Sequence, residues 1–256
     1  MKYIFGPVPS RRLGLSLGVD IIPIKTCTLD CIYCQVGKTT CKTIERKEYV
    51  SPEKVLAELK EVLQIGKKID YITLSGNGEP TLNSKLGEII KGIKKLTALP
   101  VAVITNGTLL TDKNVREELL SADLVMPSLD AATQEIFEKI DRPHPLLKIE
   151  NVIEGLMEFK KIYSGKFWLE IMLVKGINDN QNELNALKKA VKKIEPDRIQ
   201  LNTPVRPTCE KELQILSAKE LLAIKEFFGN KCEILVQLDK KKHEDHVKII
   251  NILKNR

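Results

Sequence analysis

The segment "DYITLSGNGEPTLNSKLGEIIKGIKKLTALPVAVITNG", residues 70–107, carries the pattern that decides the fold. A short apolar run at 70–76 ends in a glycine-rich loop, an amphipathic stretch follows at 84–96, and a second apolar run occupies 100–107. Short continuous apolar runs bounded by Gly or Pro are typical of parallel strands that helices cover. The segment therefore predicts one strand–helix–strand unit.

The same alternation of apolar and amphipathic stretches extends along nearly the whole chain. Strands are expected at 17–24, 70–76, 100–107, 122–130, 167–176, 196–204 and 231–238. Helices are expected at 51–66, 84–96, 111–121, 145–163, 180–194, 217–229 and 243–254. About six such units predict an α/β fold, a partial (βα)6 barrel rather than a closed barrel of eight. We expect one domain over 1–256, made of an N-terminal extension (1–16), a core barrel (17–209) and a last strand–helix unit with a terminal helix (210–256).

The composition favours a soluble protein with an anionic partner. The chain has 256 residues, 43% of them hydrophobic, and no apolar run long enough to span a membrane. It begins without the pattern of a secretory signal, so we expect a cytoplasmic location. The net charge of +7 favours an anionic partner such as nucleic acid, although a lysine-rich solvated surface explains it equally well.

Three of the six cysteines lie in "KTCTLDCIYCQ", residues 25–35, with the spacing C-x3-C-x2-C. In such a protein, cysteines point to metal binding or catalysis rather than to disulfides. A structural zinc site or a ferredoxin-type cluster would need a fourth ligand, and only Cys41 is close in sequence. Cys27, Cys31 and Cys34 alone suit an iron–sulfur centre with one open coordination position.

Small and polar residues follow one predicted strand after another. Active sites of parallel α/β folds lie at the carboxyl ends of the strands, so these residues are expected to form one site. Within the barrel, Glu170, Gln200 and Asn202 are expected to point inward and to be paired, because unpaired buried polar groups are costly. Cys232 is expected to be a buried apolar residue.

The cysteine loop "CTLDCIYCQ" (27–35) and the later "SGNGEPT" (75–81) together resemble the radical S-adenosylmethionine (SAM) superfamily. With the opening "FGPVPSRRLG" (5–14), the chain is similar to iron–sulfur oxidoreductases grouped with wyosine-type tRNA-modifying enzymes. The resemblance implies a [4Fe–4S] cluster on Cys27, Cys31 and Cys34, with SAM on the open iron. It also implies reductive cleavage of SAM to a 5′-deoxyadenosyl radical that abstracts hydrogen from a substrate.

The resemblance assigns roles to residues at the strand ends. It implies SAM contacts from Tyr33, Gly76, Asn77, Gly78, Glu79, Pro80, Thr105, Asn106, Ser128 and Asn178. Gly76 and Gly78 are expected to let the backbone approach the methionyl part of SAM. Substrate contacts are expected from Arg11, Arg12, Arg142, His144, Asn202, Arg206 and Cys209. The expected partners are a reductant such as flavodoxin or ferredoxin and, as one candidate substrate, RNA or tRNA.

Three other functions account for parts of the pattern. An activating enzyme that generates a glycyl radical would share the chemistry and act on a partner protein. An iron–sulfur electron carrier would bind a cluster without SAM chemistry. A zinc-stabilised nucleic-acid-binding module would need no reductant. The last two leave the residues at the strand ends unexplained.

Overall fold

The computed structural model describes residues 2–235, and its core is one eight-stranded sheet. In their order across the sheet, the strands are β1 (Ile4–Ser10), β2 (Gly14–Val19), β5 (Tyr71–Leu74), β6 (Val101–Thr105), β7 (Leu124–Pro127), β8 (Lys166–Met172), β9 (Arg198–Asn202) and β10 (Cys232–Ile234). Neighbours from β2 to β10 pair in parallel, and β1 is antiparallel. Within the described residues β1 and β10 are the edges, which confirms the predicted α/β fold with an open parallel sheet.

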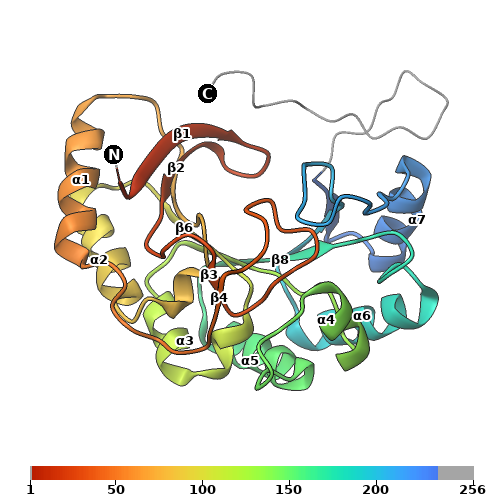
Figure 1. Cartoon of the computed structure of the whole chain (residues 1–256). Helices are drawn as coiled ribbons and strands as arrows, with labels where there is room; N and C mark the ends of the chain where they lie inside the picture. The colour runs from red at the N-terminus through yellow and green to blue at the C-terminus, as the bar shows by residue number, and fades with distance from the viewer. Residues whose placement is uncertain (1, 236–256) are drawn as a thin grey trace.

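Helices follow the outer side of the curved sheet (Figure 1). They are α1 (Pro52–Gln64), α2 (Leu86–Leu96), α3 (Lys113–Leu119), α4 (Gln134–Ile140), α5 (Ile149–Ile162), α6 (Gln181–Ile194) and α7 (Ala218–Phe228), with 3-10 turns η1 (Pro80–Leu82) and η2 (Thr108–Thr111). None of the helices between residues 2 and 235 has the length and apolar character to cross a membrane. The predicted helix at 243–254 and the end of the strand predicted at 231–238 lie outside the described residues.

The N-terminal segment differs from its prediction as an extension over 1–16. Residues 4–19 form a β-hairpin, and β2 begins at Gly14 and joins β5 in parallel. Pro7 and Pro9 obscure the strand pattern of β1 in the sequence. Proline is tolerated there because β1 is an edge strand with one side unpaired. Figure 1 shows the hairpin curving over the open side of the sheet.

Aspartates join neighbouring strands at the amino-terminal rim of the sheet. Asp70, Asp123 and Asp197 each stand directly before a strand and accept a hydrogen bond from the start of the adjacent one. The donors are the backbone N–H groups of Leu15 (2.7 Å), Val101 (2.8 Å) and Phe167 (2.7 Å). Below the polar interior, Leu13 from the hairpin turn packs with Met126 and Trp168. At this rim, aspartate side chains therefore hold neighbouring strands together, and an apolar layer fills the space between the strands.

Candidate active site

The three cysteines lie on a loop that folds over the carboxyl ends of the strands. A short parallel ladder between β3 (Thr26–Cys27) and β4 (Cys41–Lys42) closes its base. Asp30 Oδ1 accepts from the Thr39 N–H (2.7 Å) across the loop, and the Ile32 N–H donates to the Ile140 carbonyl (3.0 Å) at the end of α4. Because the loop is tied both to itself and to α4, its thiols have a fixed location. Cys41 is exposed at the base of the loop.

The thiol of Cys27 lies within electrostatic range of the thiols of Cys31 and Cys34. Burial raises the pKa of Cys27 to about 12, and the nearby Glu79 and Cys34 add to this. Burial, Asp141 and Cys27 raise the pKa of Cys31 well above its usual range. Thiolates at these positions therefore need a cation to stabilise them.

The chemistry of this donor set fits an iron–sulfur cluster. Thiolates are the usual ligands of such clusters, the three thiols come from one loop, and no histidine is among the groups that shift the pKa of Cys27 or Cys31. The described residues contain no ready-made group of three or more His, Cys, Asp or Glu side chains for a metal ion. The ligand assignment to Cys27, Cys31 and Cys34 stays a prediction.

Glu79 joins the ends of β5 and β6. Its side chain is buried, and Oε1 accepts from the Thr81 N–H (3.0 Å), the Thr81 hydroxyl (2.7 Å) and the Thr105 hydroxyl (2.6 Å). Oε2 accepts from the Asn106 N–H at 2.7 Å. Burial raises the pKa of Glu79 despite these four hydrogen bonds. The carboxylate thus positions the backbone of Asn106, and a direct SAM contact stays a prediction.

Asn106 connects the joint, meaning the hydrogen bonds by which Glu79 links the ends of β5 and β6, to the cysteine loop. Its Nδ2 donates to the Thr28 hydroxyl at 2.8 Å and lies 3.5 Å from Cys27 Sγ. Its Oδ1 accepts from the N–H (3.1 Å) and hydroxyl (2.8 Å) of Thr108. The residues predicted after β5 and β6 therefore meet the first cysteine, as expected for residues of one site.

The two glycines of "SGNGEPT" pack closely against other parts of the protein, and their expected approach to SAM stays a prediction. A Cβ on Gly76 would lie 2.4 Å from the carboxyl carbon of Asp20, and one on Gly78 would lie 2.2 Å from the Thr26 carbonyl oxygen. Asn77 donates through its backbone N–H to Asp20 (3.2 Å). The glycines thus allow the protein's own loop to pack closely against Asp20 and Thr26. Asp20, which sequence reasoning missed, follows the first parallel strand without a recognisable motif.

Tyr33 joins the cysteine loop to two buried aspartates. Its hydroxyl donates to Asp130 Oδ2, and it lies 3.4 Å from Asp141 Oδ1. Burial raises the pKa of Tyr33 well above its usual range, so the phenol keeps the proton that it donates. Asp130 Oδ1 also accepts from the Met172 N–H at 2.7 Å. The ring is thus anchored to the ends of β7 and β8. Asp141 was missed because it follows α4 rather than a strand.

Asn178 and Ser128, both predicted SAM contacts, differ in how far they are buried. Asn178 is fully buried: Oδ1 accepts from the Val174 N–H (2.8 Å), and Nδ2 donates to the carbonyls of Asp130 (2.8 Å) and Met172 (2.7 Å). It fastens the loop after β8 to the loop after β7, and its predicted SAM contact stays a prediction. Ser128 is partly exposed and lines a small enclosed space together with Tyr33 and Asn106.

Arginines of the hairpin turn reach across the barrel to β8 and β9. Arg12 forms an ion pair with the buried Glu170 and lies 3.5 Å from Gln200 Oε1. Asn202 Nδ2 donates to Glu170 Oε1 at 3.0 Å, and Arg11 donates to Asn202 Oδ1 at 3.4 Å. The predicted inward, paired polar residues are confirmed. Burial would raise the pKa of Glu170, but Arg12 and Asn202 outweigh it and leave that pKa lowered.

The other predicted substrate residues border the cysteine loop. The Cys209 N–H donates to the Cys34 carbonyl (3.1 Å), and its thiol donates to the Ile32 carbonyl (3.2 Å). Arg142 forms an ion pair with Glu210 (2.8 Å). The His144 N–H donates to the Thr28 carbonyl (2.9 Å). The structure brings all three to the loop, and their contact with substrate stays a prediction.

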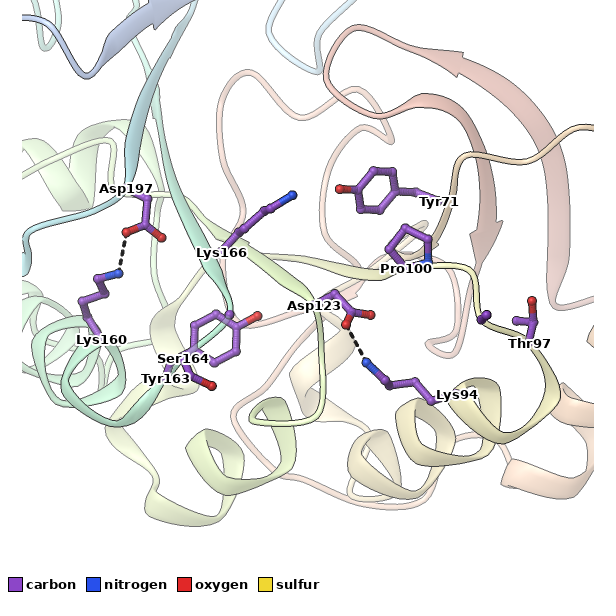
Figure 2. Close-up of a pocket in the computed structure, with 12 residues that line it drawn as sticks. Tyr71, Lys94, Thr97, Pro100, Asp123, Lys160, Tyr163, Ser164, Lys166 and Asp197 are labelled. Atoms are coloured by element: carbon purple, nitrogen blue, oxygen red, sulfur yellow. Dashed lines mark hydrogen bonds and ion pairs between the residues drawn. The ribbon is translucent and has the colours of Figure 1, made fainter.

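An open depression of about 680 Å³ lies at the opposite, amino-terminal rim. Figure 2 shows two ion pairs in its wall, Lys94 with Asp123 (2.5 Å) and Lys160 with Asp197 (2.7 Å). Both aspartates are the strand-joining residues described above. The depression is thus built from residues that stabilise the sheet, and it is far along the strands from the cysteine loop.

A family model of the radical SAM superfamily matches residues 21–188, more than half of the chain. The chain belongs to the radical SAM superfamily, as the cysteine spacing and the "SGNGEPT" loop indicated.

The chain is also similar to individual proteins, over different shares of their lengths. A UPF0026 protein of Helicobacter pylori strain J99 is 39% identical over 91% of this chain and 75% of its own length. A protein of Brachyspira hyodysenteriae named GTPase Obg is 44% identical over 93% of this chain, which spans only 35% of that protein. Among solved structures, Streptococcus suis SuiB bound to S-adenosylmethionine has a TM-score of 0.60 at 15% identity, over 82% of this chain and 46% of SuiB. That likeness shows the fold.

Proposed function

We propose that this protein is a radical SAM enzyme whose cluster is held by Cys27, Cys31 and Cys34. One observation carries the proposal: Glu79 positions Asn106 beside Cys27, so the SAM-motif loop and the cysteine loop form one connected site. When bound, the cluster and SAM would supply one-electron cleavage of SAM and a 5′-deoxyadenosyl radical that removes a hydrogen atom from the substrate.

The chain's own residues would hold and orient these groups. The loop contacts of Asp30 and Ile32 fix where the thiols lie. Tyr33, held by Asp130, would form one wall of the SAM site beside Ser128. The raised pKa values of Cys27 and Cys31 mean that loading the cluster would release protons, because the ligands are thiolates.

The substrate and the electron donor are further parts of the proposal. A low-potential protein such as flavodoxin or ferredoxin would supply the electron. The net charge of +7 supports RNA or tRNA as the substrate to test first. A glycyl-radical activity predicts instead a spin signal on a second polypeptide.

The test is electron paramagnetic resonance of the anaerobically reconstituted, reduced protein with and without SAM. We expect a [4Fe–4S]⁺ signal that changes when SAM is added. A cluster signal indifferent to SAM would favour an electron carrier and refute the proposal. Bound zinc with no iron signal would refute both the assignment of the cysteines to an iron–sulfur cluster and the SAM chemistry that depends on it.

A further inference from the structure

Three arginines, Arg11, Arg12 and Arg206, lie within electrostatic range near the carboxyl ends of β8 and β9. Arg11 and Arg12 come from the hairpin turn, and Arg206 comes from the segment after β9. Arg11 donates to Asn202 Oδ1 (3.4 Å), and Arg206 donates to Gln35 Oε1 (3.1 Å). Segments distant in sequence therefore bring guanidinium groups to one place.

The three arginines differ in what neutralises them. Arg12 is paired with Glu170, which is buried and also held by Asn202. Arg11 and Arg206 form no ion pair with any described carboxylate, and their hydrogen-bond acceptors are neutral amide oxygens. Only Arg12 has a structural partner that accounts for its charge.

The electrostatics of Arg11 reflect this excess of positive charge. Its pKa is lowered by burial first, then by Arg206 and Arg12, while Glu170 acts in the opposite direction. Partly buried like charges repel one another more strongly than charges in water. An anion between Arg11 and Arg206 would relieve that repulsion and accept hydrogen bonds from both guanidinium groups.

The position of the pair relates it to the cysteine loop. Gln35, which holds Arg206, directly follows Cys34. The same segment is joined to the loop again where the Cys209 N–H donates to the Cys34 carbonyl (3.1 Å). A group bound by Arg206 would thus lie beside the cysteine loop.

We propose that Arg11 and Arg206, with Asn202 orienting Arg11, form a subsite for an anionic group of the substrate, a phosphate or a carboxylate. The identification of that ligand as substrate rests on the proposed function. The subsite itself is a property of the folded chain and does not depend on cluster or SAM.

The experiment is calorimetric titration of the 256-residue chain, isolated without SAM, with pyrophosphate and separately with citrate. We expect saturable binding of at least one anion, and the tighter one identifies the phosphate or carboxylate class. Arg11→Gln and Arg206→Gln should each weaken binding about ten-fold, because each removes a charge-assisted contact. Arg198→Gln is the matched control: it removes an exposed arginine of β9 that is paired with Glu233 (3.6 Å), and binding should change less than about two-fold.

Either of two results would overturn the subsite: no saturable binding of either anion to the wild-type protein, or equal weakening by Arg198→Gln. Arg206 is exposed, so Arg206→Gln decides the question if Arg11→Gln unfolds. The SAM-dependent resonance change is a separate measurement. Its failure would refute the proposed function and leave anion binding intact, and the reverse also holds.

Discussion

The joint made by Glu79 gives a prediction that separates two substitutions of one carboxylate. In Glu79→Gln the amide oxygen should face the three donors that Oε1 now serves, because that orientation keeps most hydrogen bonds. The new NH2 group then faces the Asn106 N–H, donor against donor. Losing this bond within a buried site should cost about 1–3 kcal/mol.

Glu79→Ala removes all four hydrogen bonds. At about 1 kcal/mol each the loss is about 4 kcal/mol, and relief from burying a carboxylate reduces it to about 3 kcal/mol. Urea unfolding measures both variants. With a denaturant slope of about 3 kcal/mol per molar, the alanine variant should shift the midpoint by roughly 1 M.

The control is Glu88→Gln, which removes an exposed partner of Lys85 and should change the free energy of unfolding by less than about 0.5 kcal/mol. Hydrogen exchange adds a local test. In Glu79→Gln the Asn106 amide should lose protection, while the Gly107 amide, bonded to the Thr105 hydroxyl at 3.1 Å, should keep it. If both Glu79 variants unfold at the wild-type urea midpoint, the hydrogen bonds of Glu79 do not stabilise the connection between β5 and β6.

Three further predictions concern other parts of the molecule. Cys27→Ala, Cys31→Ala and Cys34→Ala should each lose iron and sulfide on reconstitution, whereas the exposed Cys41→Ala should retain them; full iron in any of the first three contradicts that ligand assignment. Burial would raise the pKa of Asp197, but Lys160 and the Phe167 N–H outweigh it and leave the pKa lowered. Its carboxylate thus stabilises the fold above its ordinary pKa, and that contribution is lost as pH falls through the lowered value. In Asp197→Asn the free energy of unfolding should therefore fall less steeply below about pH 4 than in the wild type. The same pH dependence in both proteins would count against this. Hydrogen bonds from Lys175 and Ser217 lower the pKa of Glu220 to about 2, so its carboxyl carbon should titrate near there by NMR and shift upward in Lys175→Gln; a wild-type midpoint near 4 would disprove the pairing.

The positions of the parallel strands along the chain were predictable because buried parallel strands appear in the sequence as short continuous apolar runs. Residues 70–107 gave β5, α2 and β6 almost at their observed bounds. The β1 strand was not found, because its prolines mimic a loop and only its edge position makes them acceptable. The first part of the helix predicted at 111–121 is also different: η2 ends at Thr111, and Asp112 caps α3 through the Asn114 N–H.

The membership of the site was easier to predict than the roles of its residues. A motif fixes which residues gather at the strand ends, and Glu79, Asn106 and Cys27 do meet. It does not say which atoms the protein itself uses. Both the oxygen and the nitrogen of the Asn178 side-chain amide form hydrogen bonds with backbone groups. Gly78 lacks the Cβ that would clash with the Thr26 carbonyl. Such roles depend on three-dimensional packing that no local pattern encodes.

Carboxylates join strands at both rims of the sheet, and those at the carboxyl rim are buried. This arrangement explains how an open barrel holds a site in place. At the carboxyl rim Glu79 joins β5 to β6, Asp130 joins β7 to β8, and Glu170 joins β8 to β9 through Asn202. The aspartates of the amino-terminal rim bind backbone N–H groups, and Asp123 and Asp197 also bind lysines. The carboxyl-rim acids differ because their partners include Asn106, Tyr33 and Arg12, which lie at the site. The groups that hold the strands together therefore also orient the site, so its geometry is set by the fold before any ligand binds.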